Sequence, residues 1–234
     1  MMRSLLCGVL AGWSMLAAPA LAADRLVVVE LFTSQGCPSC PPADGFFEQL
    51  AARDDVLALS LHVDYWDYIG WEDTFGSPAH TTRQRGYAAA AGRKMVYTPQ
   101  MIVNGTDHVV GSRYRDVTDL IDKHRTAQDA GITVKLRRKG AQIHLEAQSE
   151  RPRKMPLMVQ FARYMPEATV EIARGENAGR TITYTNVVTE LVEVAEWDTL
   201  APLMIDVEWP EGAPLAVLLQ YPDHGTIEAV ARLR

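Results

Sequence analysis

Cysteine is scarce in this chain, which has only three cysteines among its 234 residues. The first, Cys7, lies within a predicted secretory signal peptide (residues 1–22), so we expect the exported protein to keep only Cys37 and Cys40. Two cysteines exclude a framework of several disulfides and a four-cysteine zinc site. In an oxidising exported compartment this pair is expected to rest as a disulfide unless a reductant acts on it.

The signal peptide is predicted from three consecutive segments. A short basic start (residues 1–4) precedes an apolar run (5–18), and small residues at Ala20 and Ala22 supply a cleavage site. The apolar run is shorter than the roughly 20 residues that a membrane-spanning helix needs. We therefore expect a periplasmic or secreted protein, with no membrane insertion after signal cleavage.

Basic surface is also lacking. The formal net charge is −6 at pH 7, and the one basic run, Arg137-Arg138-Lys139, precedes Gly140 at a predicted hairpin turn. Without a basic stripe, the sequence argues against nucleic acid or an anionic membrane as a partner. No sequence feature points to a bound cofactor, so we expect none.

The order of predicted elements divides the chain into two halves. Between residues 26 and 124, strand-like runs alternate with helix-like segments, which is typical of an α/β sheet. From Gly131 onward, short alternating strands separated by turn residues predict a β-rich, sandwich-like half. We therefore expect an α/β domain over residues 23–128 and a β-rich C-terminal domain over residues 129–234.

The motif Cys37-Pro38-Ser39-Cys40 follows a predicted strand (residues 26–32) and precedes a predicted helix (41–53). The dipole and free N–H groups of a helix N-terminus hold a cysteine as a nucleophilic thiolate. Such a pair could take part in redox exchange, form a structural disulfide or supply half of the ligands of a zinc site. The ring it closes is too small to constrain the unfolded chain much, which favours redox exchange. Cys37 would then be the nucleophile and Cys40 the resolving thiol.

The first half of the chain resembles the thioredoxin superfamily. The resemblance rests on the order strand, C-x-x-C, helix, strand, helix, followed by Thr98-Pro99 at the start of a strand that ends in Asn104-Gly105. It implies a thioredoxin-like fold for the N-terminal domain, a cis bond before Pro99 and a loop that faces the cysteines. A cis bond is nearly restricted to X-Pro, and it exposes the preceding backbone to a substrate strand. Thr98 and Pro99 are therefore candidate catalytic-site residues beside the two cysteines.

Over its whole length the chain is similar to a narrower group, the exported bacterial proteins of about this length known as the DUF1223 family. The matching stretches are ELFTSQGCPSCPPAD (residues 30–44), HVDYWDYIGW (62–71) and RGENAGR (174–180). This resemblance implies the fold and the export of a bacterial protein, and it brings no established reaction.

Two departures from ordinary thioredoxins concern the surroundings of the cysteines. Gly36 precedes the first cysteine, where thioredoxins usually carry Trp. Their buried acid, which assists proton transfer, lies six residues before that cysteine, whereas Glu30 lies seven residues before Cys37. A shift of one residue moves a strand side chain to the opposite face of the sheet. Glu30 is therefore a weak candidate for the proton acceptor.

A long aromatic loop (residues 64–75) follows the second predicted strand and contains five large aromatic side chains among several acids. Because strand ends in open α/β sheets border the site crevice, we expect this loop near the cysteines. Its candidate substrate-binding residues are Tyr65, Trp66, Trp71 and Asp67. Alternatively, the aromatic side chains pack the loop onto the rest of the protein.

From these features we expect an exported thiol–disulfide oxidoreductase whose partner is a protein or small molecule that carries a disulfide or a thiol. The alternative is a non-catalytic thioredoxin-like protein with a structural or sensing disulfide, which binds a ligand or handles a metal through Cys37, Cys40 and His62. A single histidine on an apolar strand is more often packed or hydrogen-bonded than a ligand, so we assign no metal site.

Overall fold

The computed structural model describes residues 26–127 and 131–233. The predicted signal peptide (residues 1–22) and the predicted boundary at residues 128 and 129 lie outside these ranges. The strands are β1 (Val27–Thr33), β2 (Val56–His62), β3 (Gln100–Val103), β4 (Asp107–Val110), β5 (Ile132–Lys139), β6 (Gln142–Ser149), β7 (Leu157–Ile172), β8 (Arg180–Trp197), β9 (Leu203–Glu208), β10 (Leu215–Gln220) and β11 (Ile227–Leu233). The helices are α1 (Pro41–Ala51), α2 (Pro78–Ala90), α3 (Tyr114–Ala127) and the short 3-10 helix η1 (Asp67–Ile69). None of the helices in the described ranges is long and apolar enough to cross a membrane.

Eight strands form one mixed sheet in the order β11-β10-β7-β8-β2-β1-β3-β4. β1 runs parallel to β2, and β8 joins the other edge of β2 through the parallel pair Ser60 and Val187. The expected thioredoxin-like α/β domain with a β-rich, sandwich-like extension is therefore wrong, because strands from both halves share one sheet. A buried strand needs a hydrogen-bonding neighbour on each edge, and the β7–β8 hairpin supplies the second neighbour of β2.

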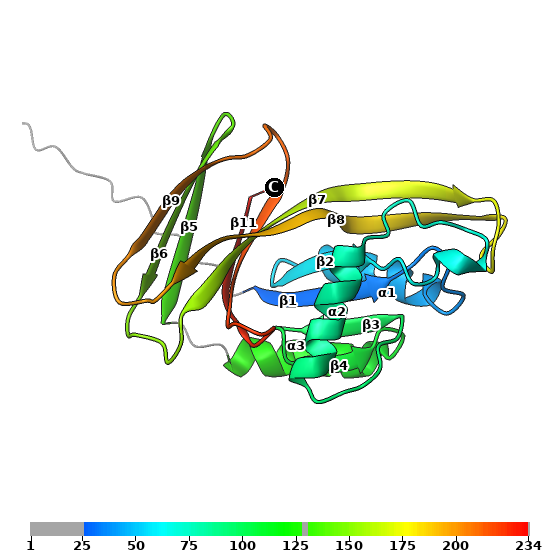
Figure 1. Ribbon diagram of the computed structural model, residues 1–234, viewed down its shortest axis with the longest axis horizontal. Helices are drawn as coiled ribbons and strands as arrows, with labels where there is room; N and C mark the ends of the chain where they lie inside the picture. Colours follow the sequence, from blue (N-terminus) through cyan, green and yellow to red (C-terminus); the bar gives the residue numbers. More distant parts are fainter. Residues whose placement is uncertain (1–25, 128–130, 234) are drawn as a thin grey trace, which may run out of the picture.

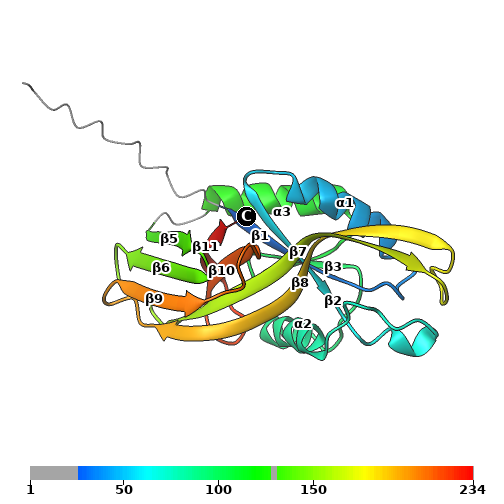
Figure 2. The same cartoon turned by 90° about the horizontal axis from the view of Figure 1, so that it is seen from above.

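The helices cover both faces of this sheet around β1 and β2. Figure 2 shows α1 and α3 on one face and α2 on the other. The apolar side chains of β1 alternate between the two helical layers. As a result, Thr33 points toward α1 and Glu30 points toward α2, so these two polar side chains lie on opposite faces of the sheet.

A second, three-stranded antiparallel sheet consists of β5, β6 and β9. Figure 1 shows this sheet at the end of the molecule away from α1 and η1. Its apolar side chains build a separate core with those of β7 and β10, in which the rings of Phe161 and Trp209 lie 5.7 Å apart. The strand-rich character predicted from residue 131 onward is thus divided between two sheets.

The β7–β8 hairpin spans the whole molecule, with strands of 16 and 18 residues. In Figure 1 its closed end lies beside the aromatic loop and the first turn of α1. This length brings the hairpin tip (residues 173–179) to the cysteines, about 140 residues away in the chain.

Candidate functional site

Cys37 and Cys40 form a disulfide at the start of α1, with their Cα atoms 5.4 Å apart. Cys40 is the N-cap residue of α1, and two prolines begin the helix, where a missing N–H costs no hydrogen bond. The backbone carbonyl of Cys40 accepts bonds from the first helical N–H groups. The sequence pattern predicts the first cysteine, Cys37, at the N-terminus of the helix. In the structure Cys40 occupies this position, and Cys37 lies in the turn before it.

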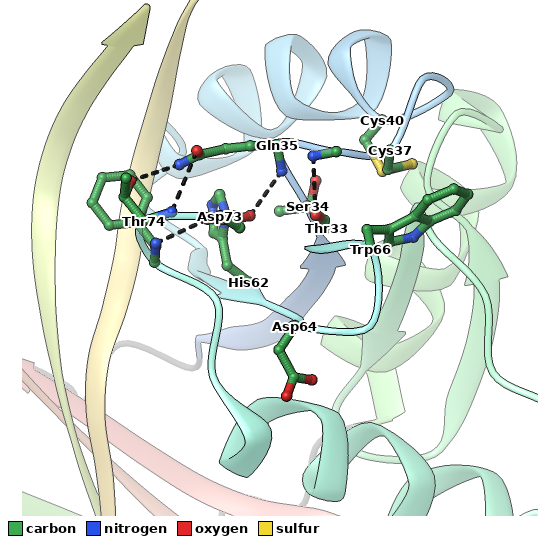
Figure 3. Close-up of polar contacts among 12 residues, drawn as sticks. Thr33, Ser34, Gln35, Cys37, Cys40, His62, Asp64, Trp66, Asp73 and Thr74 are labelled. Atoms are coloured by element: carbon green, nitrogen blue, oxygen red, sulfur yellow. Dashed lines mark hydrogen bonds and ion pairs between the residues drawn. A yellow bond between two sulfur atoms is a disulfide. The ribbon is translucent and has the colours of Figure 1, made fainter. Parts of the chain in front are cut away.

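Both cysteines are completely buried, with exposed fractions of 0%, although Pro38 and Ser39 between them are exposed. The preceding Gly36 lies against the aromatic loop, since a Cβ atom there would be 3.1 Å from Trp66 Cβ and 3.3 Å from Ile69 Cδ1. Figure 3 shows the Trp66 indole next to the disulfide. The absence of a side chain at Gly36 thus makes room for the aromatic loop, which lies over the cysteines.

The Thr98-Pro99 peptide bond is cis and directly precedes β3. The Ser39 hydroxyl donates a long hydrogen bond of 3.5 Å to the Thr98 carbonyl, and it also lies 3.5 Å from Cys37 Sγ. The Trp66 indole N–H donates to the Thr98 hydroxyl at 2.8 Å. The four predicted catalytic-site residues therefore lie together, with Trp66 beside them.

The remaining candidates of the aromatic loop form hydrogen bonds within the protein. The Tyr65 hydroxyl donates to Gln84 at 3.1 Å, and the Trp71 indole N–H donates to Gln35 at 2.8 Å. The Asp67 carboxylate accepts a backbone N–H of the same loop at 3.1 Å. These contacts pack the loop onto the protein, and of the four predicted substrate-binding residues it is Trp66 that reaches the disulfide.

The hairpin tip holds the cysteines from a second side. The buried Asn177 donates through Nδ2 to the backbone carbonyls of Gln35 and Cys37, both at 2.9 Å. Gly175 has a φ of +75°, which favours glycine, and a Cβ there would be 3.2 Å from Trp71 Cβ. Sequence reasoning missed this contact, because no local pattern relates a turn near residue 177 to a motif at residue 37.

A buried histidine–aspartate pair supports the segment before the cysteines. Asp73 Oδ2 accepts the backbone N–H of Gln35 at 2.7 Å and lies 2.7 Å from His62 Nδ1 (Figure 3). Burial alone would raise the pKa of Asp73, but the hydrogen bond and charge of His62 hold that pKa below its usual value. The His62 ring packs edge-on against Phe75 and Tyr184, and its Nε2 has no hydrogen-bond partner within the described residues.

Asp44 is a buried acid in the first turn of α1. Its Oδ1 accepts a bond of 2.7 Å from the Thr33 hydroxyl, whereas its Oδ2 has no hydrogen-bond partner in the part of the chain that the structure describes. Burial raises the pKa of Asp44 to about 7, against the opposing effects of the His62 charge and the Thr33 hydrogen bond. Sequence reasoning missed this residue. The signal that could have identified it is the position of an acidic residue one helical turn after Cys40.

Glu30 belongs to a different network, on the α2 face of the sheet. Arg83 donates to it through Nε at 2.6 Å, and the Tyr87 hydroxyl donates to it as well. Arg83 also donates to Gln160 and Gln220, so the buried charges are paired and hydrogen-bonded. The strand alternation that weakened Glu30 as a proton acceptor is present in the structure, and it separates Glu30 from the cysteines by the thickness of the sheet.

The described residues contain no group of three or more His, Cys, Asp or Glu side chains that could hold a metal ion. Cys37 and Cys40 are joined to each other, and His62 Nδ1 lies against Asp73. The geometry therefore gives no support to metal handling through these three residues.

The fold and the site define a class of protein in which a buried C-x-x-C disulfide lies beneath an aromatic loop at one end of a mixed sheet. The chain belongs to the DUF1223 family of proteins of unknown function, whose family profile matches residues 28–220. This match confirms the family resemblance drawn from the sequence.

Two solved structures are similar to this protein. Protein AGR_C_4864 from Agrobacterium tumefaciens is 35% identical, with a TM-score of 0.76 over 88% of this chain and 93% of that one. HBP35 of Porphyromonas gingivalis is 13% identical, with a TM-score of 0.63 over 90% of this chain and 75% of that one, and shares the fold alone. No match was found among curated proteins.

Proposed function

We propose that this protein is an exported thiol–disulfide oxidoreductase that acts through Cys37 and Cys40. The observation that carries the proposal is the position of the disulfide, at the first turn of α1 and facing the backbone of Thr98. A disulfide between residues three apart constrains the unfolded chain little, so stabilisation is a weak reason for its presence. Exchange with an external thiol or disulfide is the stronger reason.

In the reduced protein, the Cys37 thiolate attacks one sulfur of a substrate disulfide, releases one substrate thiolate and forms a mixed disulfide. Cys40 then loses its proton, attacks the Cys37 sulfur and releases the second substrate thiolate. Two electrons pass from the protein dithiol to the substrate, and the released thiolates take up the two protons. The Ser39 hydroxyl, 3.5 Å from Cys37 Sγ, is positioned to stabilise a thiolate there. With substrate thiols and the oxidised protein, the same steps run in reverse.

Exchange requires the aromatic loop to move, because both cysteines have no exposed surface. The hydrogen bond from Trp66 to Thr98, with a net value of about 1 kcal/mol, is one of the contacts that hold the loop closed. An extended substrate segment could pair with the Thr98 backbone as Trp66 leaves, in the manner of an added β-strand. A peptide substrate would therefore gain backbone hydrogen bonds that offset the loss of the bond from Trp66 to the Thr98 hydroxyl.

The same burial favours a second candidate, a binding protein with a structural disulfide. In this function the aromatic loop would present a surface to a ligand, and the exposed Tyr68 ring, with 82% of its surface accessible, would be its contact. The two candidates differ in one property: the oxidoreductase exchanges its disulfide in the folded state, and the binding protein does not.

Trapping of mixed disulfides tests the proposal. The full chain is exported from a bacterial host as the Cys40→Ser variant, quenched in acid and separated without reductant. We expect adducts on Cys37 that dithiothreitol releases, and their mass spectra identify the substrates. The matched controls, Cys37→Ser and the double variant, should lack these adducts. Equal and negligible adduct formation by all three variants would contradict the oxidoreductase proposal and favour the binding protein.

Export is a separate part of the proposal, supported by the composition of residues 1–22. Expression of the full chain followed by cell fractionation and N-terminal mass measurement is the test. We expect a periplasmic or secreted protein that begins near residue 23. An unprocessed chain in the cytoplasm would contradict export and leave the exchange chemistry to be judged by the trapping experiment.

A further inference from the structure

We infer that Asp44 is the internal proton acceptor and donor for the Cys40 thiol during disulfide exchange. This inference rests on the proposed function and adds a residue to its chemistry. In the oxidising direction, the Cys40 S–H bond breaks and its proton passes to the Asp44 carboxylate. The Cys40 sulfur then attacks Cys37, while the protonated Asp44 later returns the proton to solvent or to the departing substrate thiolate.

The first support is the relation of the two residues along α1. Cys40 has helical backbone angles, with a φ of −78° and a ψ of −38°, and the Asp44 N–H donates to the Cys40 carbonyl at 3.0 Å. Residues four apart on a helix lie on one face, with Cβ atoms about 5–6 Å apart. Asp44 is therefore the acid that the first helical turn places on the same face of α1 as the resolving cysteine.

The second support is the unused hydrogen-bonding capacity of the carboxyl group. Asp44 is buried, Thr33 from β1 engages its Oδ1, and its Oδ2 has no hydrogen-bond partner within the described ranges. A buried polar atom without a partner costs about 1–3 kcal/mol, so such an atom calls for an explanation. A carboxyl oxygen that exchanges a proton with a neighbouring thiol provides one.

The third support is the set of charged and titratable groups around Asp44. They are His62 from β2, Asp73 from the aromatic loop and Tyr184 from β8, and all three are buried. Burial raises the pKa of Asp44, the charge of His62 lowers it and that of Asp73 raises it further, so the pair that holds the Gln35 backbone also contributes to the proton affinity of the acid. With its pKa near 7, Asp44 populates both protonation forms at neutral pH, as a group that both gives and takes protons must.

The other buried acids do not compete for this role. Glu30 lies on the opposite face of the sheet in its pair with Arg83. Asp73 keeps its pKa below the usual value through His62, and its Oδ2 is engaged by the Gln35 N–H. Asp44 therefore combines a carboxyl oxygen without a partner among the described residues, a place on the Cys40 face of α1 and a suitable proton affinity.

The test separates the two chemical steps with a chromogenic aromatic disulfide, which releases one coloured thiolate when Cys37 attacks and a second when Cys40 resolves. Stopped-flow absorbance follows both releases between pH 5 and 9 in the reduced protein purified after export, which is expected to keep only these two cysteines. For Asp44→Asn we expect the second release to slow by about 100-fold and to lose its pH dependence near 7, because positioned acid–base groups contribute at least about this factor. The first release should change by less than about threefold, because Cys37 attack needs no proton transfer through Asp44.

A second variant keeps the acid and alters only its surroundings. Thr33→Val removes the hydrogen bond that lowers the pKa of Asp44, so the second release should persist with its pH midpoint moved to higher pH. An unchanged second release in Asp44→Asn, with the wild-type pH profile, would overturn the inference while leaving the proposed function intact. No release from the folded wild-type protein would instead overturn the proposed function and this inference with it.

Discussion

The buried Asp44 predicts a pH dependence of stability that can be worked out from the structure. Burial raises the pKa of this carboxyl from 3.8 to about 7 in the folded protein. The folded state therefore binds the proton more tightly than the unfolded state does. This contribution to stability is complete below pH 3.8 and is lost as the pH rises through about 7.

The magnitude follows from the same pKa. A rise of the pKa from 3.8 to about 7 corresponds to about 4 kcal/mol of folding free energy. This is the most stability that the wild-type protein has lost through Asp44 once the pH reaches 8. Asp44→Asn carries no charge and keeps an oxygen for the Thr33 hydroxyl. We therefore expect the variant to be similar to wild type near pH 4 and more stable by up to about 4 kcal/mol near pH 8.

Urea unfolding of the oxidised proteins between pH 4 and 9, followed by tryptophan fluorescence, measures this difference. Burial also lowers the pKa values of His80 and His108, but both histidines are present in both proteins. The difference between variant and wild type therefore isolates Asp44. A difference that stays constant from pH 4 to pH 9 would refute the assignment of a raised pKa to this acid.

Three further predictions concern the contacts around the site. Trp66→Ala removes the indole that lies over the disulfide, so reduction of the folded protein by dithiothreitol should accelerate by about 10-fold or more, whereas Tyr68→Ala, at an exposed ring, should leave the rate unchanged. Asn177→Ala loses two buried hydrogen bonds, and thermal unfolding should show a loss of about 1–3 kcal/mol; an unchanged melting temperature would speak against a stabilising contact between the hairpin tip and the cysteine segment. Glu30→Gln leaves Arg83 as an uncompensated buried charge, so urea unfolding should show a loss of about 3 kcal/mol or more, while disulfide exchange in the folded fraction stays as in wild type. A matching loss of exchange would place Glu30 in the chemistry after all.

Local signals in the sequence predicted the elements around the cysteines. The apolar run after residue 25, the prolines after Cys40 and the strand after residue 55 correspond to β1, α1 and β2 within a residue or two. Apolar runs, prolines at a helix start and an Asn-Gly turn each act over a few residues, so they can be recognised without the fold. The same locality explains why Cys37, Cys40, Thr98 and Pro99 could be grouped in advance.

The sheet arrangement could not be predicted in the same way. Alternation in β8 shows which side chains are buried, but it does not show that the strand joins the edge of β2. β7 continues past Pro166, although a proline removes a ladder donor and usually interrupts a strand pattern in a sequence. The pairing with β8 shifts register between Arg163 and Tyr164, a few residues earlier, and Asn186, which faces Pro166, adopts a φ of +50°.

The buried polar residues of the site were hidden for a related reason. Asp44, His62 and Asp73 lie in three different elements, and a single charged residue in a sequence gives no sign of burial. Their association depends on the alternation of β1 and β2 and on the path of the aromatic loop, both of which become visible only in three dimensions. Asn177 contacts the backbone of Gln35 and Cys37 from about 140 residues away, so it was hidden for the same reason.

Thiol–disulfide exchange at this site is tested most directly by the redox equilibrium, in glutathione buffers, of the folded protein purified after export, which is expected to keep only Cys37 and Cys40. Samples are equilibrated at a series of ratios of reduced to oxidised glutathione. They are then quenched in acid and alkylated, and their masses are measured by mass spectrometry. We expect one reversible transition in which Cys37 and Cys40 gain two alkyl groups together while the circular dichroism of the fold is retained. A disulfide that stays intact at every ratio, and yields to reductant only after the protein is unfolded, would contradict the assignment of thiol–disulfide exchange to this site.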